Sequence, residues 1–308
     1  MHRELVSIII PTYNRASLLS RAIKSVINQT YSNWEALIIA DNCTDDTSKV
    51  LDVYREDSKI QITELAENVG GAKARNIGLR KARGEYISFL DDDDEWNPEK
   101  IYDQIKVFKE RNDICIVSCN YLKKTENGTF KSSLPEMVNL DKMLYRNVLG
   151  NFSCCVTKKE YVENIYIANE LIACQDWDLW IKILLRTDLN GLVLSKSLVE
   201  KDNSHGFSRL TSSHTDANDA HWKFICNTKH IMNPTQKAYR FANYYSRQSR
   251  VHSDYKLYLK SLAYLLRSFY KTSLHDIITI LYPFWLLGDN LQVWMKKSFS
   301  LRKVKEIE

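Results

Sequence analysis

One stretch of the sequence reads Gly84-Glu-Tyr-Ile-Ser-Phe-Leu-Asp-Asp-Asp-Asp94 and joins an apolar strand pattern directly to four successive aspartates. Like charges this close repel one another, and burial raises the pKa values of carboxyl groups unless a cation lies nearby. Carboxylate oxygens suit hard cations such as Mg²⁺ or Mn²⁺, which bind through a few carboxylates together with phosphate oxygens. The stretch therefore indicates a metal site at the end of a strand. The alternative is a solvated acidic turn before a helix.

Strand and helix patterns alternate on both sides of this stretch. Apolar runs predict strands at residues 6–10, 35–40, 60–65, 86–90 and 114–121. Helical spacing of apolar residues predicts helices that include residues 18–27, 72–82 and 99–111. This alternation predicts an α/β fold with a Rossmann-like, mostly parallel sheet flanked by helices. Ligands bind past the carboxyl ends of such strands, where three polar clusters fall, at residues 12–14, 41–42 and 91–94.

The composition is that of a globular protein with free thiols. The chain has 308 residues, of which 44% are hydrophobic, enough for one large domain or for one medium domain with an appendage. Its seven cysteines form no C-x-x-C pair, which argues against a structural zinc site. The N-terminus lacks the apolar length of a signal peptide. We therefore expect a cytoplasmic protein.

Charge is distributed unevenly along the chain. Residues 1–220 carry a formal charge of −5, whereas residues 221–308 carry +10 and are rich in aromatic side chains. Such asymmetry suggests two parts with different partners. A basic part suits nucleic acid or an anionic membrane surface. No motif that reads nucleic acid is present, so we expect no nucleic-acid partner.

Several ordered motifs between about residues 5 and 210 resemble those of the family 2 glycosyltransferases of GT-A fold, especially bacterial enzymes of surface-polysaccharide (O-antigen or capsule) assembly. The opening Val6-Ser-Ile-Ile-Ile-Pro-Thr-Tyr-Asn-Arg15 is similar to the family's first strand and nucleotide-contacting loop. The resemblance implies a nucleotide-sugar site that includes Pro11, Thr12, Tyr13 and Asn14.

Residues 41–47, Asp-Asn-Cys-Thr-Asp-Asp-Thr, are similar to the family pattern Asp-Asp-Gly-Ser-x-Asp-x-Thr. The resemblance implies that Asp41 contacts the uracil. Ala40 replaces the first acid of the pattern, and Asn42-Cys43 replaces Gly-Ser. These departures weaken the case for uridine.

Residues 68–78 resemble the family's diphosphate-side helix, and the physical reasoning agrees. Glycines allow close backbone approach, and a helix N-terminus with Lys73 and Arg75 attracts phosphate. The strand that ends in the aspartates resembles the one that carries the family's D-x-D motif. The resemblance implies that Asp91 faces the nucleotide and ribose, that Asp92 belongs to the same nucleotide-sugar site, and that Asp93 is the direct metal ligand.

A second constellation, Cys174-Gln-Asp-Trp-Asp-Leu-Trp180, resembles the family's E-D motif. The resemblance implies that Asp176 is the general base, a role that contributes roughly 10²–10⁴ in rate. Gln175 replaces the usual acid. The alternative is that Asp176 only caps the following helix. Trp177 and Trp180 are expected to pack in the core, or to stack on a sugar ring.

His205 and Arg209 lie in a polar segment, residues 202–211, that follows a strand pattern. The resemblance implies that His205 is a further metal ligand and that Arg209 contacts the diphosphate. The alternative is that both are ordinary loop residues.

The resemblance implies an inverting, metal-dependent transferase of a hexosyl or N-acetylhexosaminyl group. It uses a nucleotide-diphosphate sugar, most simply a UDP-sugar, with Mn²⁺ or Mg²⁺, and it acts on a lipid-linked glycan hydroxyl in bacterial polysaccharide biosynthesis. Two other functions stay open. A sugar nucleotidyltransferase also has a Rossmann-like sheet and an acidic metal site. A catalytically silent sugar-nucleotide binder is suggested by Ala40, Asn42 and Gln175.

We predict a catalytic domain at residues 1–220, with a nucleotide-sugar half at about 1–121 and an acceptor half at about 122–220. Residues 221–308 are predicted to form a helical region that holds the enzyme peripherally at the inner face of the cytoplasmic membrane. The apolar stretch 277–287 is too short to span a bilayer, which takes about 20 residues. Residues 255–271 form an aromatic helical face beside a basic stripe. The alternative is a helical subdomain or a homo-oligomer contact.

Overall fold

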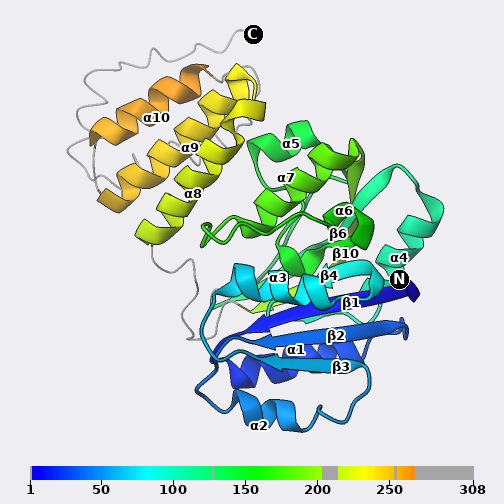
Figure 1. Cartoon of the computed structure of the whole chain (residues 1–308). Coiled ribbons are helices and arrows are strands. Elements are labelled where there is room, and N and C mark those ends of the chain that lie inside the picture. The colour runs from blue at the N-terminus through cyan, green and yellow to red at the C-terminus, as the bar shows by residue number, and fades with distance from the viewer. Residues whose placement is uncertain (1, 127, 203–213, 253–254, 268–308) are drawn as a thin grey trace. The chain divides into compact units, whose positions relative to one another are not determined.

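A computed structural model describes residues 2–126, 128–202, 214–252 and 255–267 (Figure 1). The chain divides into two compact units, Met1–Ser212 and Ser213–Glu308. The first unit holds a large sheet with helices along it, and the second holds helices in its described residues. The assignment of catalytic and membrane roles to the two parts stays a prediction.

The sheet of the first unit has the strand order β3-β2-β1-β4-β9-β6-β10-β5, with β7 paired to β6 and β8 paired to β10. Its strands are β1 His2–Thr12, β2 Trp34–Ala40, β3 Ile60–Glu64, β4 Gly84–Phe89, β5 Asp94–Trp96, β6 Ile114–Thr125, β7 Gly128–Lys131, β8 Met137–Val138, β9 Val156–Lys158 and β10 Asn190–Asp202.

Strands β1 to β4 are parallel, as the alternating pattern predicts. The short strand β9 then lies antiparallel between β4 and β6, so β6 is not a neighbour of β4. Because β9 reverses the direction twice, β6 and β10 again run with β1 to β4. The α/β fold is confirmed, and the sheet is mixed.

The helices of the first unit follow the strands closely in sequence. They are α1 Ala16–Ile27, α2 Thr47–Asp52, α3 Gly71–Lys81, α4 Lys100–Glu110, α5 Leu140–Tyr145, α6 Lys159–Val162 and α7 Gln175–Thr187, together with the 3₁₀ turn η1 Phe152–Cys154. Figure 1 shows them flanking the sheet. The helices predicted at residues 18–27, 72–82 and 99–111 are confirmed to within two residues.

Helix α3 packs closely against strand β1 at Gly78. A Cβ atom on Gly78 would lie 2.4 Å from Cγ2 of Ile9, so a larger residue has no room there. The start of α3, with Arg75 one turn in, follows β3 and lies at the carboxyl edge of the sheet.

The second unit is helical and rich in aromatic contacts. Its described helices are α8 His214–Thr228, η2 Lys229–Ile231, α9 Pro234–His252 and α10 Tyr255–Arg267. The rings of Trp222 and Tyr244 lie 4.7 Å apart, and those of Tyr245 and Tyr264 stack at 5.7 Å. The predicted helical, basic and aromatic character is confirmed for these helices. The apolar stretch 277–287 lies outside the described residues.

Within the described ranges, no helix combines the length and the apolar character that a membrane crossing requires.

Candidate active site

The three predicted polar clusters meet at the carboxyl edge of the sheet. Strands β1, β2 and β4 run side by side, so the loops that follow them lie together. The Thr12 hydroxyl donates a 2.8 Å hydrogen bond to Oδ2 of Asp92, and the backbone N–H of Asp41 donates to the Thr12 carbonyl at 2.9 Å. The three loops therefore form one polar surface.

Arg15 neutralises the middle of the acidic cluster. Its guanidinium donates to Asp92 at 2.9 Å and to Asp93 at 3.3 Å. Burial raises the pKa of Asp92 to about 6, against the opposing charge of Arg15 and the hydrogen bond from Thr12. Of these two carboxylates, Asp93 has the larger exposed fraction, 14% against 6%. Asp93 is therefore the one better placed to meet a ligand.

The outer aspartates, Asp91 and Asp94, are held together by one amide. Asn151 donates to Asp91 at 3.1 Å and to Asp94 at 2.8 Å. Burial raises the pKa of Asp94 to about 7, although the charge of Lys201 opposes this. Ser153 accepts from the backbone N–H of Asp91 at 3.0 Å. Asp94, the last of the four aspartates, is thus a buried carboxyl at the start of β5.

Arg75 connects the acidic loop after β4 to helix α7, which carries the predicted base. Its guanidinium donates to Asp91 at 2.6 Å and to the amide oxygen of Gln175 at 3.0 Å. It also lies 4.3 Å over the ring of Phe152. Gln175 therefore supplies an uncharged acceptor where the resembling family has an acid. Lys73, on the same helix, is exposed.

Asp41 orders the turn that opens α3. Its two carboxylate oxygens accept from the backbone N–H groups of Val69 and Gly70 at 2.7 and 2.8 Å, and its side chain is buried. Each oxygen keeps a second lone pair. The predicted contact of Asp41 with the uracil stays a prediction.

The loop after β1 presents the remaining predicted nucleotide contacts. Pro11 is buried in the strand, while Tyr13 is 49% exposed. Asn14 has a φ of 52°, a conformation that asparagine tolerates better than most residues, and it accepts from the Thr44 backbone N–H at 2.7 Å. This bond ties the loops after β1 and β2 together. The four predicted residues thus lie at this edge, with Tyr13 at the surface.

Asp176, the predicted base, lies in the first turn of α7. Its Oδ1 accepts from the Trp177 backbone N–H at 2.8 Å, and its Oδ2 accepts from the Asn147 amide at 3.2 Å. Cys174 occupies the N-cap position, so Asp176 is not the capping residue. Burial raises the pKa of Asp176 to about 6, and the negative charge of Asp91 acts in the same direction. A carboxyl that titrates near 6 suits a base working near neutral pH.

The two tryptophans of this helix are packing residues. Trp180 is fully buried against Phe89 and Phe152, and Trp177 donates its indole N–H to the Met143 carbonyl at 2.7 Å. The core-packing interpretation is therefore confirmed.

The metal prediction rests on chemistry rather than on an assembled cluster. In the part of the chain that the structure describes, no group of three or more His, Cys, Asp or Glu side chains is arranged to hold a metal. Mg²⁺ is commonly bound through one or two carboxylates together with substrate phosphates, so Asp93 beside a bound diphosphate fits this donor set. His205 and Arg209 lie outside the described residues.

Sequence reasoning missed four residues of this site. They are Arg15, Asn147, Asn151 and Ser153. Arg15 ends the motif quoted for the first strand and its loop, and the run Asn147-Val-Leu-Gly-Asn151, with a glycine between two asparagines, indicates a turn. Nothing in that run indicates which carboxylates its amides reach.

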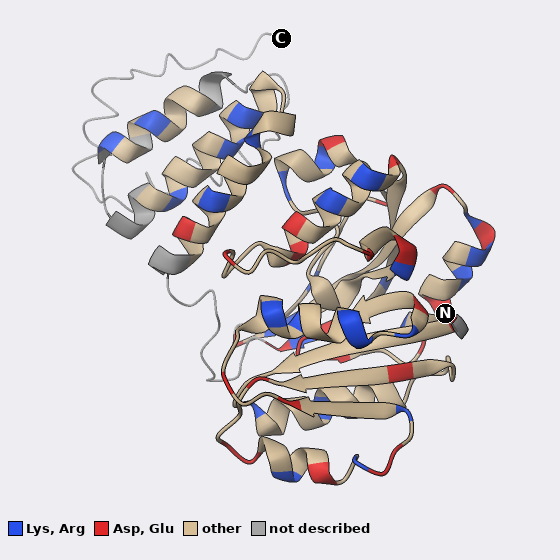
Figure 2. Cartoon of the chain, in the orientation of Figure 1, with Lys and Arg blue, Asp and Glu red and all other residues tan. Residues whose placement is uncertain are grey.

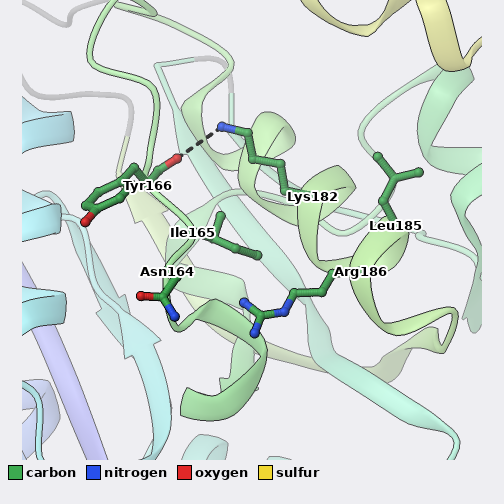
Figure 3. A pocket seen from close by; sticks show the side chains of 6 residues that line it. All are labelled: Asn164, Ile165, Tyr166, Lys182, Leu185 and Arg186. Carbon is green, nitrogen blue, oxygen red and sulfur yellow. Dashed lines mark hydrogen bonds between the residues drawn. The ribbon is translucent and has the colours of Figure 1, made fainter.

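A shallow depression lies away from this site, beside the second half of α7. It is lined by Asn164, Ile165, Tyr166, Lys182, Leu185 and Arg186, and Figure 3 shows Lys182 bonded to the backbone oxygen of Tyr166. None of the predicted site residues lines it.

The fold is that of a GT-A glycosyltransferase, and its acidic strand end lies near a carboxyl on a neighbouring helix. A profile described as Glycosyl transferase family 2 matches residues 7–165. The chain belongs to this family, and the resemblance drawn from its motifs is confirmed.

Two relatives are similar to this chain over more than half of its length. The chain is 30% identical over 259 residues to the Escherichia coli UDP-Glc:alpha-D-GlcNAc-diphosphoundecaprenol beta-1,3-glucosyltransferase WfgD, covering 82% of this chain and 97% of that one. It is 33% identical over 210 residues to an uncharacterized glycosyltransferase of Rickettsia bellii, covering 65% of this chain. The alignment spans only 29% of that relative's length.

Two solved structures share the fold. S. aureus TarS 1–349 in complex with UDP-GlcNAc has a TM-score of 0.66 at 20% identity, with 90% of this chain and 78% of that chain covered. The mannosyltransferase PcManGT of Pyrobaculum calidifontis, in complex with GDP-Man and Mn²⁺, has a TM-score of 0.53 at 17% identity, with 94% and 83% covered.

Proposed function

We propose that this chain transfers a sugar, with inversion and with a divalent metal, from a UDP-sugar to a hydroxyl of a lipid-linked glycan in bacterial polysaccharide biosynthesis. The observation that carries the proposal is the bridge made by Arg75, which joins Asp91 of the acidic loop to Gln175, the residue before Asp176. One guanidinium thus holds a carboxylate of the acidic loop on one side and, on the other, the residue next to the base-like carboxyl.

In the proposed reaction, Asp176 takes the proton from the acceptor hydroxyl. The hydroxyl oxygen forms a bond to the anomeric carbon as the bond from that carbon to the diphosphate oxygen breaks, and the electron pair leaves with the nucleotide diphosphate. Attack opposite the leaving group inverts the anomeric centre. The start of α3, with Lys73 and Arg75, attracts the donor phosphates.

Asp93, with His205 as a second candidate, would hold Mn²⁺ or Mg²⁺. The metal neutralises charge on a diphosphate leaving group when it is bound. The UDP-sugar donor is suggested by WfgD, whose name gives UDP-Glc, and by the TarS complex with UDP-GlcNAc. WfgD also motivates the lipid-linked acceptor, because its named acceptor is a diphosphoundecaprenol-linked sugar.

A donor screen tests this function. We expect the protein to hydrolyse at least one of four nucleotide sugars when Mn²⁺ or Mg²⁺ is present: UDP-glucose, UDP-galactose, UDP-N-acetylglucosamine and GDP-mannose. The hydrolysis should cease when EDTA is added. Released nucleoside diphosphate is the readout, with the Asp176→Asn variant as the matched background.

Other results would favour the rival functions. Release of pyrophosphate from UTP and a sugar 1-phosphate would identify a nucleotidyltransferase. Binding of the donors without any turnover, including in the presence of lipid-linked acceptors, would identify a silent binder.

The second unit is proposed to attach the enzyme to the inner face of the cytoplasmic membrane. Figure 2 shows several basic bands on its helices, and Lys256 and Lys260 on α10 are exposed. Leu262, a residue of the predicted aromatic face, is internal, because it packs with Tyr264 against Ala242 of α9. The proposal therefore rests on charge, with Leu259, 44% exposed, as an apolar contact.

We expect the full chain to sediment with vesicles that contain phosphatidylglycerol at low salt, and to stay in solution with phosphatidylcholine vesicles. Each basic residue near an anionic surface contributes about 1 kcal/mol, so the double variant Lys256→Glu, Lys260→Glu should weaken partitioning by at least about 30-fold. The matched control reverses the charge of Lys106 and Lys109, which are exposed on α4 of the other unit. If the folded full chain ignores anionic vesicles, a protein–protein contact replaces the membrane role.

A further inference from the structure

The side-chain amide of Asn147 forms three hydrogen bonds, two through its nitrogen and one through its oxygen. It lies just after α5, and its Nδ2 donates to the Gly150 carbonyl at 2.9 Å and to Oδ2 of Asp176 at 3.2 Å. Its Oδ1 accepts from the Leu149 backbone N–H at 3.1 Å. Because the oxygen faces a donor and the nitrogen faces two acceptors, the reversed orientation of the amide would break all three bonds. Asn147 therefore presents an N–H group to the carboxylate.

The loop that carries Asn147 is itself held in place. Leu149 is fully buried, and its carbonyl accepts from the Ser118 hydroxyl of β6. Gly150 has a φ of +81°, and a Cβ atom there would lie 3.0 Å from Sγ of Cys154. These contacts leave the Asn147 amide little freedom to follow a moving carboxylate. The N–H group that Asn147 donates to Asp176 is thus fixed before any substrate binds.

The other groups around Asp176 shift its pKa in opposite directions. Burial and the charge of Asp91 favour the neutral acid, whereas the Trp177 backbone N–H, Lys201 and Arg75 favour the carboxylate. The backbone N–H serves Oδ1, and Asn147 serves Oδ2 from a different element. A hydrogen bond donated to a carboxylate stabilises its charged form and fixes the direction of its remaining lone pairs.

We propose that Asn147 is the positioning residue of the general base, holding the Asp176 carboxylate ionised and oriented toward the acceptor hydroxyl. This inference rests on the proposed function, in which Asp176 is the base. Asn147 touches neither donor nor acceptor in this role, and it acts through Asp176 alone.

The first test measures the titration of Asp176 directly. Protein labelled with ¹³C at the aspartate carboxyl carbons is titrated from pH 4 to 8, and the resonance absent from Asp176→Asn is assigned to Asp176. We expect Asn147→Ala to raise the midpoint of this resonance by at least about half a unit, because a donor to the charged form is lost. The acid limb of the kcat profile for hydrolysis of the best donor in the panel should move by the same amount. At pH 8, where Asp176 is ionised in both proteins, the lost orientation should still lower kcat by about threefold or more, and the donor KM should be unchanged.

A second variant and a control keep the test independent of folding. Asn147→Asp has nearly the same shape and places a second carboxyl beside Asp176, so the acid limb should move further than in Asn147→Ala. Asn139→Ala removes the N-cap of α5, where Asn139 accepts from the Lys142 backbone N–H at 3.0 Å, and should lower stability without moving the profile.

The outcomes separate this inference from the function beneath it. If Asp176→Asn keeps normal turnover, the base assignment is wrong and the inference fails with it. If Asp176→Asn loses turnover but both Asn147 variants keep the parent's midpoint and acid limb, only the positioning role is overturned.

Discussion

Replacing Asp93 with alanine is expected to reduce sugar transfer by at least about 10³, because several kcal/mol of charge stabilisation on the leaving diphosphate would be lost. Asp93 stands at the strand end beside Asp92 and has the larger exposed fraction of the two. Its present partner is Arg15, which also binds Asp92 and can keep that bond when Asp93 turns to a cation.

Calorimetry with UDP, with and without Mn²⁺, checks this expectation. The Asp93→Ala variant should bind UDP as the parent does in EDTA, and more weakly than the parent only when Mn²⁺ is present. Asp46→Ala is the matched control, since Asp46 is 74% exposed in a neighbouring loop and pairs with Lys49. Near-normal transfer by Asp93→Ala would show that the metal-site assignment is wrong.

Replacing Asp176 with asparagine is expected to leave donor binding intact and to reduce kcat by at least about 10². Asparagine keeps the size of the side chain but cannot take a proton. Since the pKa of Asp176 is raised to about 6, the parent enzyme should lose turnover about tenfold per pH unit below 6 and level off above it. A base works in its ionised form, so activity is present above this pKa and is lost as the pH falls through it.

The matched control for this variant is Asp178→Asn on the same helix. Asp178 is buried and pairs at 2.6 Å with Lys182, which lies one turn further along α7. It should keep turnover within a few-fold. A fall in donor affinity alone in Asp176→Asn, with kcat unchanged, would refute the assignment of the base.

The first half of the fold was predictable because its apolar sequence patterns are local and each extends over several residues. Strands β1, β2 and β4 have six or more residues each and contain the predicted apolar runs, and the helices between them show regular apolar spacing. Parallel strands place their following loops at one edge, so the polar clusters of Thr12, Asp41 and the four aspartates could be expected to meet there. Their meeting is confirmed by the bonds from Thr12 to Asp92 and from Asp41 to the Thr12 carbonyl.

The second half was less predictable for two physical reasons. Strands β5, β7, β8 and β9 have only two to four residues each, too few for any period to be recognised. The contacts of Asn147 and Asn151 join residues far apart in the chain, and an amide side chain carries no sign of its distant partner. Gln175 was recognised as a departure from the family, but its bond to Arg75 depends on how α3 meets α7.

Strand β9 has a consequence for the order in which the molecule assembles. Its three residues pair with Tyr86 to Ser88 of β4 on one side, and two of them pair with Ile116 and Val117 of β6 on the other, so β9 joins two halves of the sheet that are distant in sequence. Closing such long loops is slow compared with forming neighbouring strand–helix units. The turn that carries Asn147 and Asn151 is followed by η1 and then by β9. We therefore expect a chain emerging from the ribosome to form strands β1 to β4 early, and to complete the proposed site only after this short strand closes the sheet.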